Sequence, residues 1–145
     1  MSSLELLLWV HASATWLMVG IIWFVQIVHY PLFAAVPSQA FQAYQEKHVR
    51  RTGWVVAPPM LVEVGSALAL TLYSSESLDA WLVWGGVALL LVVWGATAVF
   101  SVPLHNQLLN GFDARAHRRL LRTNWLRTLA WTLRGLFAVW LIVSA

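Results

Sequence analysis

The stretch WLVWGGVALLLVVWGATAVFSVPL, residues 81–104, decides the fold, because it contains no charged side chain along its whole length. A helix needs about 20 predominantly apolar residues to cross the hydrocarbon core of a bilayer. Three further apolar runs, at about 4–32, 54–73 and 120–143, meet this requirement. None shows the period-two alternation of a membrane β-barrel. The sequence therefore predicts an all-α fold, a transmembrane four-helix bundle that forms a single integral membrane domain over residues 1–145.

The composition of the whole chain agrees with this class. Of the 145 residues, 60% are hydrophobic and 10% are charged, whereas a soluble domain is about 45–50% apolar and about 25% charged. This balance excludes a soluble enzyme domain, a disordered region and a nucleic-acid binder. The sequence also contains no cysteine, so disulfides, thiolate metal sites and thiol redox chemistry are excluded.

The basic residues between the spans predict how the chain lies in the membrane. The termini and the loop at 74–79 contain no Lys or Arg, whereas the connections after spans 1 and 3 are rich in both. Because loops rich in Lys and Arg stay in the cytoplasm, we expect a multi-pass protein of the inner membrane with both termini outside. The basic residues concerned are Lys47, Arg50, Arg51, Arg115, Arg118, Arg119 and Arg122.

The connection between spans 1 and 2 contains a helical pattern of its own, at about 40–51. Ser38 is a candidate N-cap, and aromatic and polar side chains then recur at three- and four-residue steps, so they share one face. We therefore expect a short interfacial helix there. In span 2, Pro58 and Pro59 mark either a kink inside a longer helix, which we favour, or the first turn of the span.

Charged residues at membrane depth are the first candidates for function. Such charges cost at least about 2.5–3.5 kcal/mol each, so they normally face the bundle interior and find partners. Arg127 and Arg134 share one face of span 4 with Trp131 and Asn124, and Glu63 in span 2 lies at a depth between the two arginines. We expect Glu63 to pair with Arg127, Arg134 or both. This arrangement is either a buried ion pair that fixes packing or an anion-tolerant cavity with a catalytic or binding role.

Histidines provide the second candidate chemistry. Four of them, His29, His48, His105 and His117, fall on the basic side of the bundle, and histidine is the commonest protein metal ligand. We predict that the first three, with His117 as a weaker fourth ligand, hold a transition metal, Fe, Cu or Zn. The alternative is that the rings are amphipathic anchors at the level of the lipid headgroups.

His11 and Trp131 are candidate cofactor-binding residues. Helix bundles commonly hold cofactors between facing helices, so His11 in span 1 could ligate a haem and Trp131 could line a cavity against a planar ligand. The other interpretation of His11 is a histidine that is hydrogen-bonded within the bundle.

Two short motifs resemble a known family. VPLHNQL at 102–108 and RTNWLRT at 122–128 are similar to segments of the small four-span family that includes the fungal anthrone oxygenases. This resemblance implies oxidation of polycyclic aromatics, or oxygen insertion into them. It also implies that Asn106, Asn124 and Arg127 are functional residues.

A weaker likeness links His11, Trp16 and His29 to the four-span bacterial protoporphyrinogen oxidase, which binds haem. That family carries a lysine in span 3 and an Asn-Glu pair in its fourth helix. This chain has neither, so the activity is not carried over.

Together these features predict a membrane-embedded oxidoreductase or oxygenase-like protein that acts on a hydrophobic or aromatic substrate. The alternatives are a non-enzymatic lipid-binding, anion-binding or proton-coupled transport module that uses Glu63, Arg127 and Arg134, and a small assembly subunit of a membrane complex. The expected partners are the lipid bilayer and a hydrophobic small molecule, and a homo-oligomer or a redox partner in the membrane stays open. The sequence has no nucleotide-binding motif, so a reductant would have to come from another molecule.

Overall fold

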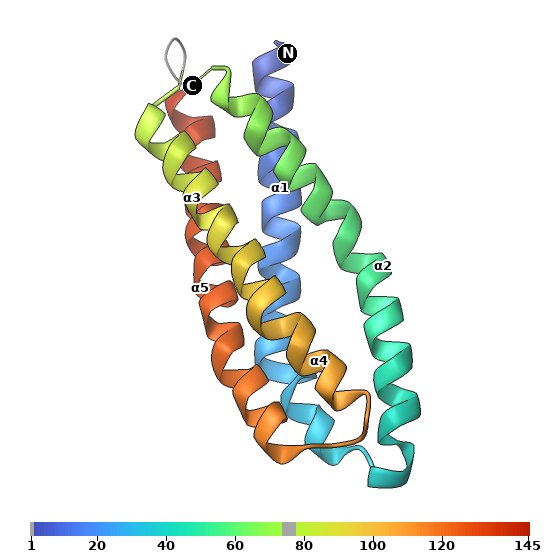
Figure 1. Cartoon of the computed structure of the whole chain (residues 1–145). Coiled ribbons are helices and arrows are strands. Elements are labelled where there is room, and N and C mark those ends of the chain that lie inside the picture. The colour runs from blue at the N-terminus through green and yellow to red at the C-terminus, as the bar shows by residue number, and fades with distance from the viewer. Residues whose placement is uncertain (1, 74–77) are drawn as a thin grey trace.

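The computed structural model describes residues 2–73 and 78–145, and these residues form helices joined by short connections (Figure 1). The helices are α1 (Ser3–Phe24), η1 (Val25–His29), η2 (Pro31–Ala35), α2 (Ser38–Thr71), α3 (Ala80–Ala96), η3 (Thr97–Ser101), α4 (Val102–Leu108) and α5 (Ala114–Ser144). Four helical segments are long and apolar enough to cross a membrane: Ser3–Ala35, Ser38–Thr71, Ala80–Leu108 and Ala114–Ser144. The predicted bundle of four transmembrane helices is therefore confirmed, and the chain is a multi-pass membrane protein.

α1 and α5 make most of the contacts that hold the four long segments together. The most extensive contacts between helices join α3 with α5, α1 with α5 and α1 with α2. Both termini lie at one end of the bundle, and α2 diverges from α1 toward the other end (Figure 1). Residues from α1, η1, η2, α2, α3, α4 and α5 share one apolar core that includes Met18, Phe33, Val93 and Trp131.

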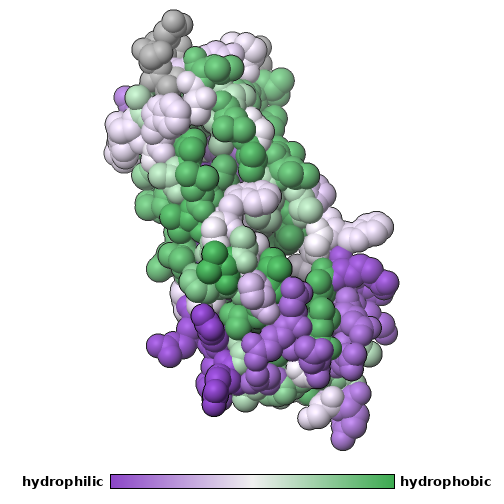
Figure 2. Space-filling view, viewed as in Figure 1, coloured by the Kyte–Doolittle hydropathy of each residue, from purple (hydrophilic) through white to green (hydrophobic). Residues whose placement is uncertain are grey.

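The polar surface is concentrated at the end opposite the termini. Figure 2 shows hydrophilic residues gathered there, below a mainly apolar surface. We call this part of the molecule the basic end. It is defined by seven exposed residues, Lys47, Arg50, Arg51, Arg115, Arg118, Arg119 and Arg122.

The helix α2 corrects one prediction. The expected interfacial helix at 40–51 is not a separate element, because the backbone stays helical from Ser38 to Thr71 and passes through Pro58 and Pro59. The first turns of α2 bury side chains inside the bundle instead of lying on the membrane surface. Phe41, for example, is fully buried and packs edge-on against Phe33, with the two ring centroids 6.1 Å apart. A longer helix that contains both prolines, the interpretation favoured from the sequence, is confirmed.

The last helix, α5, begins at Ala114, directly after Asp113. Before α5, Gly111 adopts a positive φ of 121°. The Asp113 carboxylate then accepts hydrogen bonds from the backbone N–H groups of Arg115, at 2.7 Å, and Ala116, at 3.2 Å. These two donors favour the charged carboxylate, so they lower the pKa of Asp113 below its ordinary value.

Candidate functional site

Three histidines from three different segments meet near the basic end. His29 closes η1, His48 lies in α2 and His105 lies in α4. The Nε2 atom of His29 is 2.8 Å from Nδ1 of His48, and the rings of His48 and His105 have centroids 5.1 Å apart. The predicted convergence of these three residues is therefore confirmed.

Gln45 and Tyr30 hold the ring of His105 in one orientation. The side-chain amide nitrogen of Gln45 lies 2.9 Å from Nδ1 of His105 and 3.4 Å from its carbonyl oxygen. An amide NH2 group only donates, so Nδ1 accepts, and we assign the proton of the neutral ring to Nε2. Nε2 lies 2.8 Å from the Tyr30 hydroxyl oxygen, so the ring donates to it. The hydroxyl proton of Tyr30 then remains available to a further acceptor.

Two π-helical turns bring these side chains to one level of the bundle. The turn η1 covers Val25–His29 and directly precedes Tyr30, and η3 covers Thr97–Ser101, directly before the helix that carries His105. A π-turn inserts one residue into an α-helix and changes the face that later side chains occupy, and such turns are frequent at functional sites. The sequence pattern, interpreted with an α-helical period, did not predict either turn.

A cavity of about 190 Å³ adjoins the histidine cluster. Residues of α2, η3, α4 and α5 form its walls, together with Tyr30. Apolar side chains such as Val56 and Val102 contribute part of the lining. The polar lining residues are Tyr30, His48, Thr52, Thr97, Ser101, His105, Asn106 and Arg127.

Arg127 brings an uncompensated positive charge to this cavity. Its side chain is 8% exposed, and Nη1 donates to Ser101 Oγ at 3.0 Å and to Asn124 Oδ1 at 3.1 Å. The guanidinium carbon lies 5.2 Å from the ring centroid of Trp131, and Nε is buried without a hydrogen-bond partner in the described part of the chain. No carboxylate of the described residues lies within ion-pair distance of Arg127. A buried charge normally has a partner of opposite sign, so an anion in the cavity would complete this arrangement.

Asn124 connects Arg127 to the first span. Its side-chain amide donates to the Gln26 side-chain oxygen at 2.9 Å, and both residues are buried. Asn124 thus holds the Arg127 guanidinium in position through its side-chain oxygen. Unlike Asn106, it does not line the cavity.

Glu63 pairs with Arg134, which confirms one of the two predicted partners. Arg127 is not part of this ion pair among the described residues. Oε1 of Glu63 lies 3.2 Å from Nη2 and 3.3 Å from Nε of Arg134. Trp131 Nε1 donates to Oε2 at 2.9 Å, and Arg134 Nη1 donates to the carbonyl oxygen of Gly86. The space beside Arg134 measures about 10 Å³. The pair thus links α2, α3 and α5 in a closed contact, which favours the packing interpretation over a shared cavity.

His11 and His117 lie apart from the cluster. His11 is buried, with Nδ1 2.8 Å from Ser66 Oγ. It adjoins the same space of about 10 Å³, which is about the space of one water molecule, so the side chains leave no room for a haem there. Nε2 of His117 lies 2.7 Å from the Tyr30 carbonyl oxygen, and its ring stacks on Phe33.

The predicted metal site lacks a suitable ligand arrangement. Across residues 2–73 and 78–145, no group of three or more His, Cys, Asp or Glu side chains is placed to hold a metal ion. The facing nitrogens of His29 and His48 share a hydrogen bond, and both ring nitrogens of His105 have partners. A metal ion bound by these side chains would therefore have to replace the hydrogen bonds that they make in this arrangement.

Comparisons of the chain with protein-family models, with curated proteins and with solved structures found no match. The fold and the site therefore define the class of protein: a helical membrane bundle with a cavity near its basic end and a buried arginine at the cavity wall. Membership of the anthrone oxygenase-like family stays a prediction from the two sequence motifs.

Proposed function

We propose that the protein binds a hydrophobic small molecule through an anionic oxygen in the cavity beside Arg127, and that it exchanges a proton with this molecule. The observation that carries the proposal is the buried Arg127 without a carboxylate partner among the described residues, at the wall of a 190 Å³ cavity. The Tyr30 hydroxyl adds a second donor, because His105 already donates to its oxygen. Preorganised donors of this kind stabilise an oxyanion.

The remaining lining indicates the class of ligand. Val49, Val56 and Val102 contribute an apolar surface to the cavity, and apolar walls with a few convergent polar groups are typical of small-molecule sites. A small aromatic carboxylate, phenolate or enolate meets both requirements. This class agrees with the hydrophobic or aromatic substrate expected from the sequence.

The hydrogen-bonded pair of His29 and His48 offers a route for the proton. His48 lines the cavity, whereas His29 is half-buried and lines a groove on the outer surface. A proton taken up by one ring can cross the 2.8 Å hydrogen bond and leave from the other ring. Histidine suits this role because a neutral ring can accept a proton at one nitrogen and donate one from the other.

Replacement of Tyr30 by Phe tests the donor assignment. Loss of a hydrogen bond to a charged group costs about 1.5–3 kcal/mol, so we expect the Kd for naphthalene-2-carboxylate to rise about 10- to 150-fold. The measurement is calorimetric titration of the protein in lipid nanodiscs. Tyr44→Phe is the matched control, because Tyr44 is a half-buried α2 residue that does not line the cavity, and its Kd should not change. Equal affinities of the two variants, or no binding to the unaltered protein, would contradict the proposal.

A metal-dependent oxidoreductase, the first expectation from the sequence, is the second candidate. The convergence of three imidazoles beside one cavity favours it. Elemental analysis of the detergent-purified protein distinguishes the two. Stoichiometric Fe, Cu or Zn that is lost in a His48→Ala/His105→Ala variant would support the oxidoreductase, whereas metal-free protein that binds naphthalene-2-carboxylate would support the first proposal.

We further propose that the basic end faces the cytoplasm of a cell with an inner membrane, and that both termini lie outside. The support is the positive-inside rule, applied to the seven exposed basic residues at this end. Alkaline phosphatase fused after Ala145 is then expected to be active, and a green fluorescent protein inserted at Gly111 to fluoresce. An inactive phosphatase together with a dark insertion would indicate the opposite orientation.

A further inference from the structure

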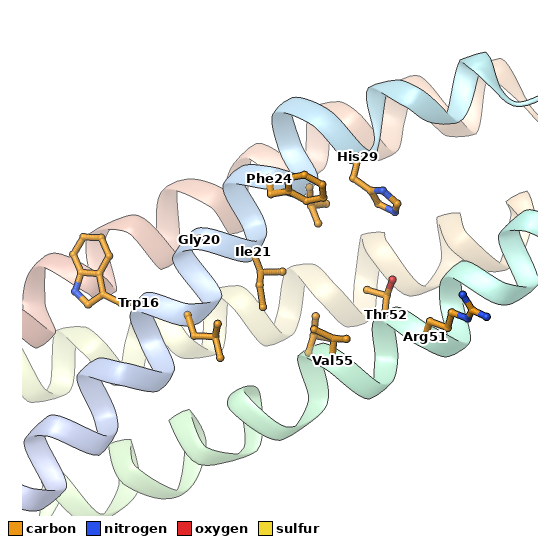
Figure 3. Close-up of a pocket in the computed structure, with 11 residues that line it drawn as sticks. Trp16, Gly20, Ile21, Phe24, His29, Arg51, Thr52 and Val55 are labelled. Carbon is orange, nitrogen blue, oxygen red and sulfur yellow. The ribbon is translucent and has the colours of Figure 1, made fainter.

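A long apolar groove lies between α1 and α2 on the outer surface of the bundle. The section nearer the basic end measures about 550 Å³ and the next section about 520 Å³, and Leu17 lines both. Figure 3 shows the first section, with Trp16 at one end and His29, Thr52 and Arg51 at the other. The groove is therefore apolar along its length and polar only toward the basic end.

The two helices leave this space open for a local reason. Gly20 contributes no side chain to the floor of the groove, and a Cβ atom there would meet nothing within 4 Å. On the opposite wall, Pro58 and Pro59 line the second section, where α2 has no N–H group to donate. The result is an exposed apolar concavity at the depth of the lipid tails.

We propose that this groove binds one acyl chain of an anionic phospholipid, with the phosphate group held at Arg51. Along α2 the lining extends from Arg51 to Val62, which is about 16 Å at about 1.5 Å per residue. Half of a hydrocarbon core about 30 Å thick is about 15 Å. The groove thus has the length of one lipid chain from the headgroup level to the bilayer midplane.

The charge at the polar end of the groove selects the headgroup. Arg51 is exposed and points to the region beside Thr52 and His29. Among the residues that the structure describes, no Asp or Glu lines either section of the groove. Basic residues at the membrane surface attract anionic lipids, and the polar side chains of Thr52 and His29 line the groove next to that charge. This complementarity favours an anionic phospholipid over a neutral one.

The lipid site is separate from the cavity beside Arg127. Thr52 and Val56 line both spaces, so α2 forms the wall between them, but Arg127 does not line the groove. A lipid in the groove would cover the outer face of the cavity wall. The inference therefore holds whether or not an aromatic anion binds beside Arg127.

Gly20→Leu tests the groove by filling it. The protein would be transferred from nanodiscs of equal phosphatidylglycerol and phosphatidylcholine into detergent, and retained lipid measured by native mass spectrometry. We expect the unaltered chain to keep one phosphatidylglycerol, and the Gly20→Leu variant to keep at least tenfold less. Gly95→Leu is the matched control, because Gly95 is an exposed α3 residue whose added Cβ also meets nothing within 4 Å and which lines neither section.

Arg51→Gln tests the headgroup contact, with Arg50→Gln as its control, because Arg50 is exposed but does not line the groove. One basic residue near a membrane surface contributes enough to change lipid binding about fivefold. We expect Arg51→Gln to lower the preference for phosphatidylglycerol by about this factor and Arg50→Gln to leave it unchanged. Lipid retention unaffected by Gly20→Leu, or a dimer without bound lipid, would overturn the proposal.

Discussion

Arg134→Met is expected to lower the free energy of unfolding by about 3–5 kcal/mol, because it leaves a buried carboxylate without its counter-charge. Glu63 is fully buried, and after the substitution its partner among the contacts described above is the indole N–H of Trp131. The measurement is unfolding by sodium dodecyl sulfate in mixed micelles, followed by circular dichroism.

The double variant Glu63→Leu/Arg134→Met shows how much of the lost stability comes from the unpaired carboxylate. Replacement of both members of a buried ion pair by apolar residues is often close to neutral, so most of the lost stability should return. The coupling between the two substitutions is the quantity of interest. A double variant as unstable as the sum of the single variants would show that the two residues act independently.

Arg127→Met is expected to weaken ligand binding and, unlike Arg134→Met, to leave the free energy of unfolding nearly unchanged. Truncation of one partner of a buried charge pair costs about 2–5 kcal/mol, so the Kd for naphthalene-2-carboxylate should rise from about 30-fold to several thousandfold. Stability should change by no more than about 1 kcal/mol. Removal of the uncompensated charge gains about 2.5–3.5 kcal/mol, and loss of the two charge-assisted bonds to Ser101 and Asn124 costs at least about 1.5 kcal/mol each, so the two effects nearly cancel.

The control for this variant is Arg122→Met. Arg122 lies on the same helix but is exposed and does not line the cavity, so its loss should leave the Kd unchanged. Unfolding is measured as for Arg134→Met. The proposal would be wrong if Arg127→Met kept its affinity, or if it destabilised the protein as strongly as Arg134→Met.

The features that follow from bilayer dimensions were predictable from the sequence. Four apolar runs of sufficient length give four helices because backbone polar groups in lipid must be satisfied within each segment. The position of His29, His48 and His105 near one end of their spans was enough to predict that they converge. The start of α5 after Gly111 and Asp113 also has a local cause, because the chemistry of these two residues acts over a few positions.

Which side chains pair with one another depends on how each helix is rotated about its own axis, and this rotation was not predictable from the sequence. Helical rise placed Glu63 between Arg127 and Arg134, so depth alone did not select a partner. Selection depends on Gly86, whose carbonyl oxygen accepts from Arg134, and on Ser101, which accepts from Arg127. Ser101 closes the π-turn η3, which shifts the helical phase of the residues that follow it.

The contacts of Tyr30 and Gln45 with His105 also depend on helix rotation, so they were not predictable from the sequence. Tyr30 directly follows the π-turn η1, and Gln45 is buried one turn before His48. The signal that could have pointed to Gln45 is its place near the face that carries Phe41 and His48. The separate helix predicted at 40–51 concealed this, because it placed that face on the membrane surface.

The position of a bound aromatic anion tests the central claim most directly. The measurement is a structure of the protein with 6-bromonaphthalene-2-carboxylate, in which anomalous scattering locates the bromine atom. We expect the ligand in the cavity, with its carboxylate within hydrogen-bond distance of the Arg127 guanidinium and the Tyr30 hydroxyl. Bromine in the α1–α2 groove, together with a cavity that contains no ligand, would contradict the account.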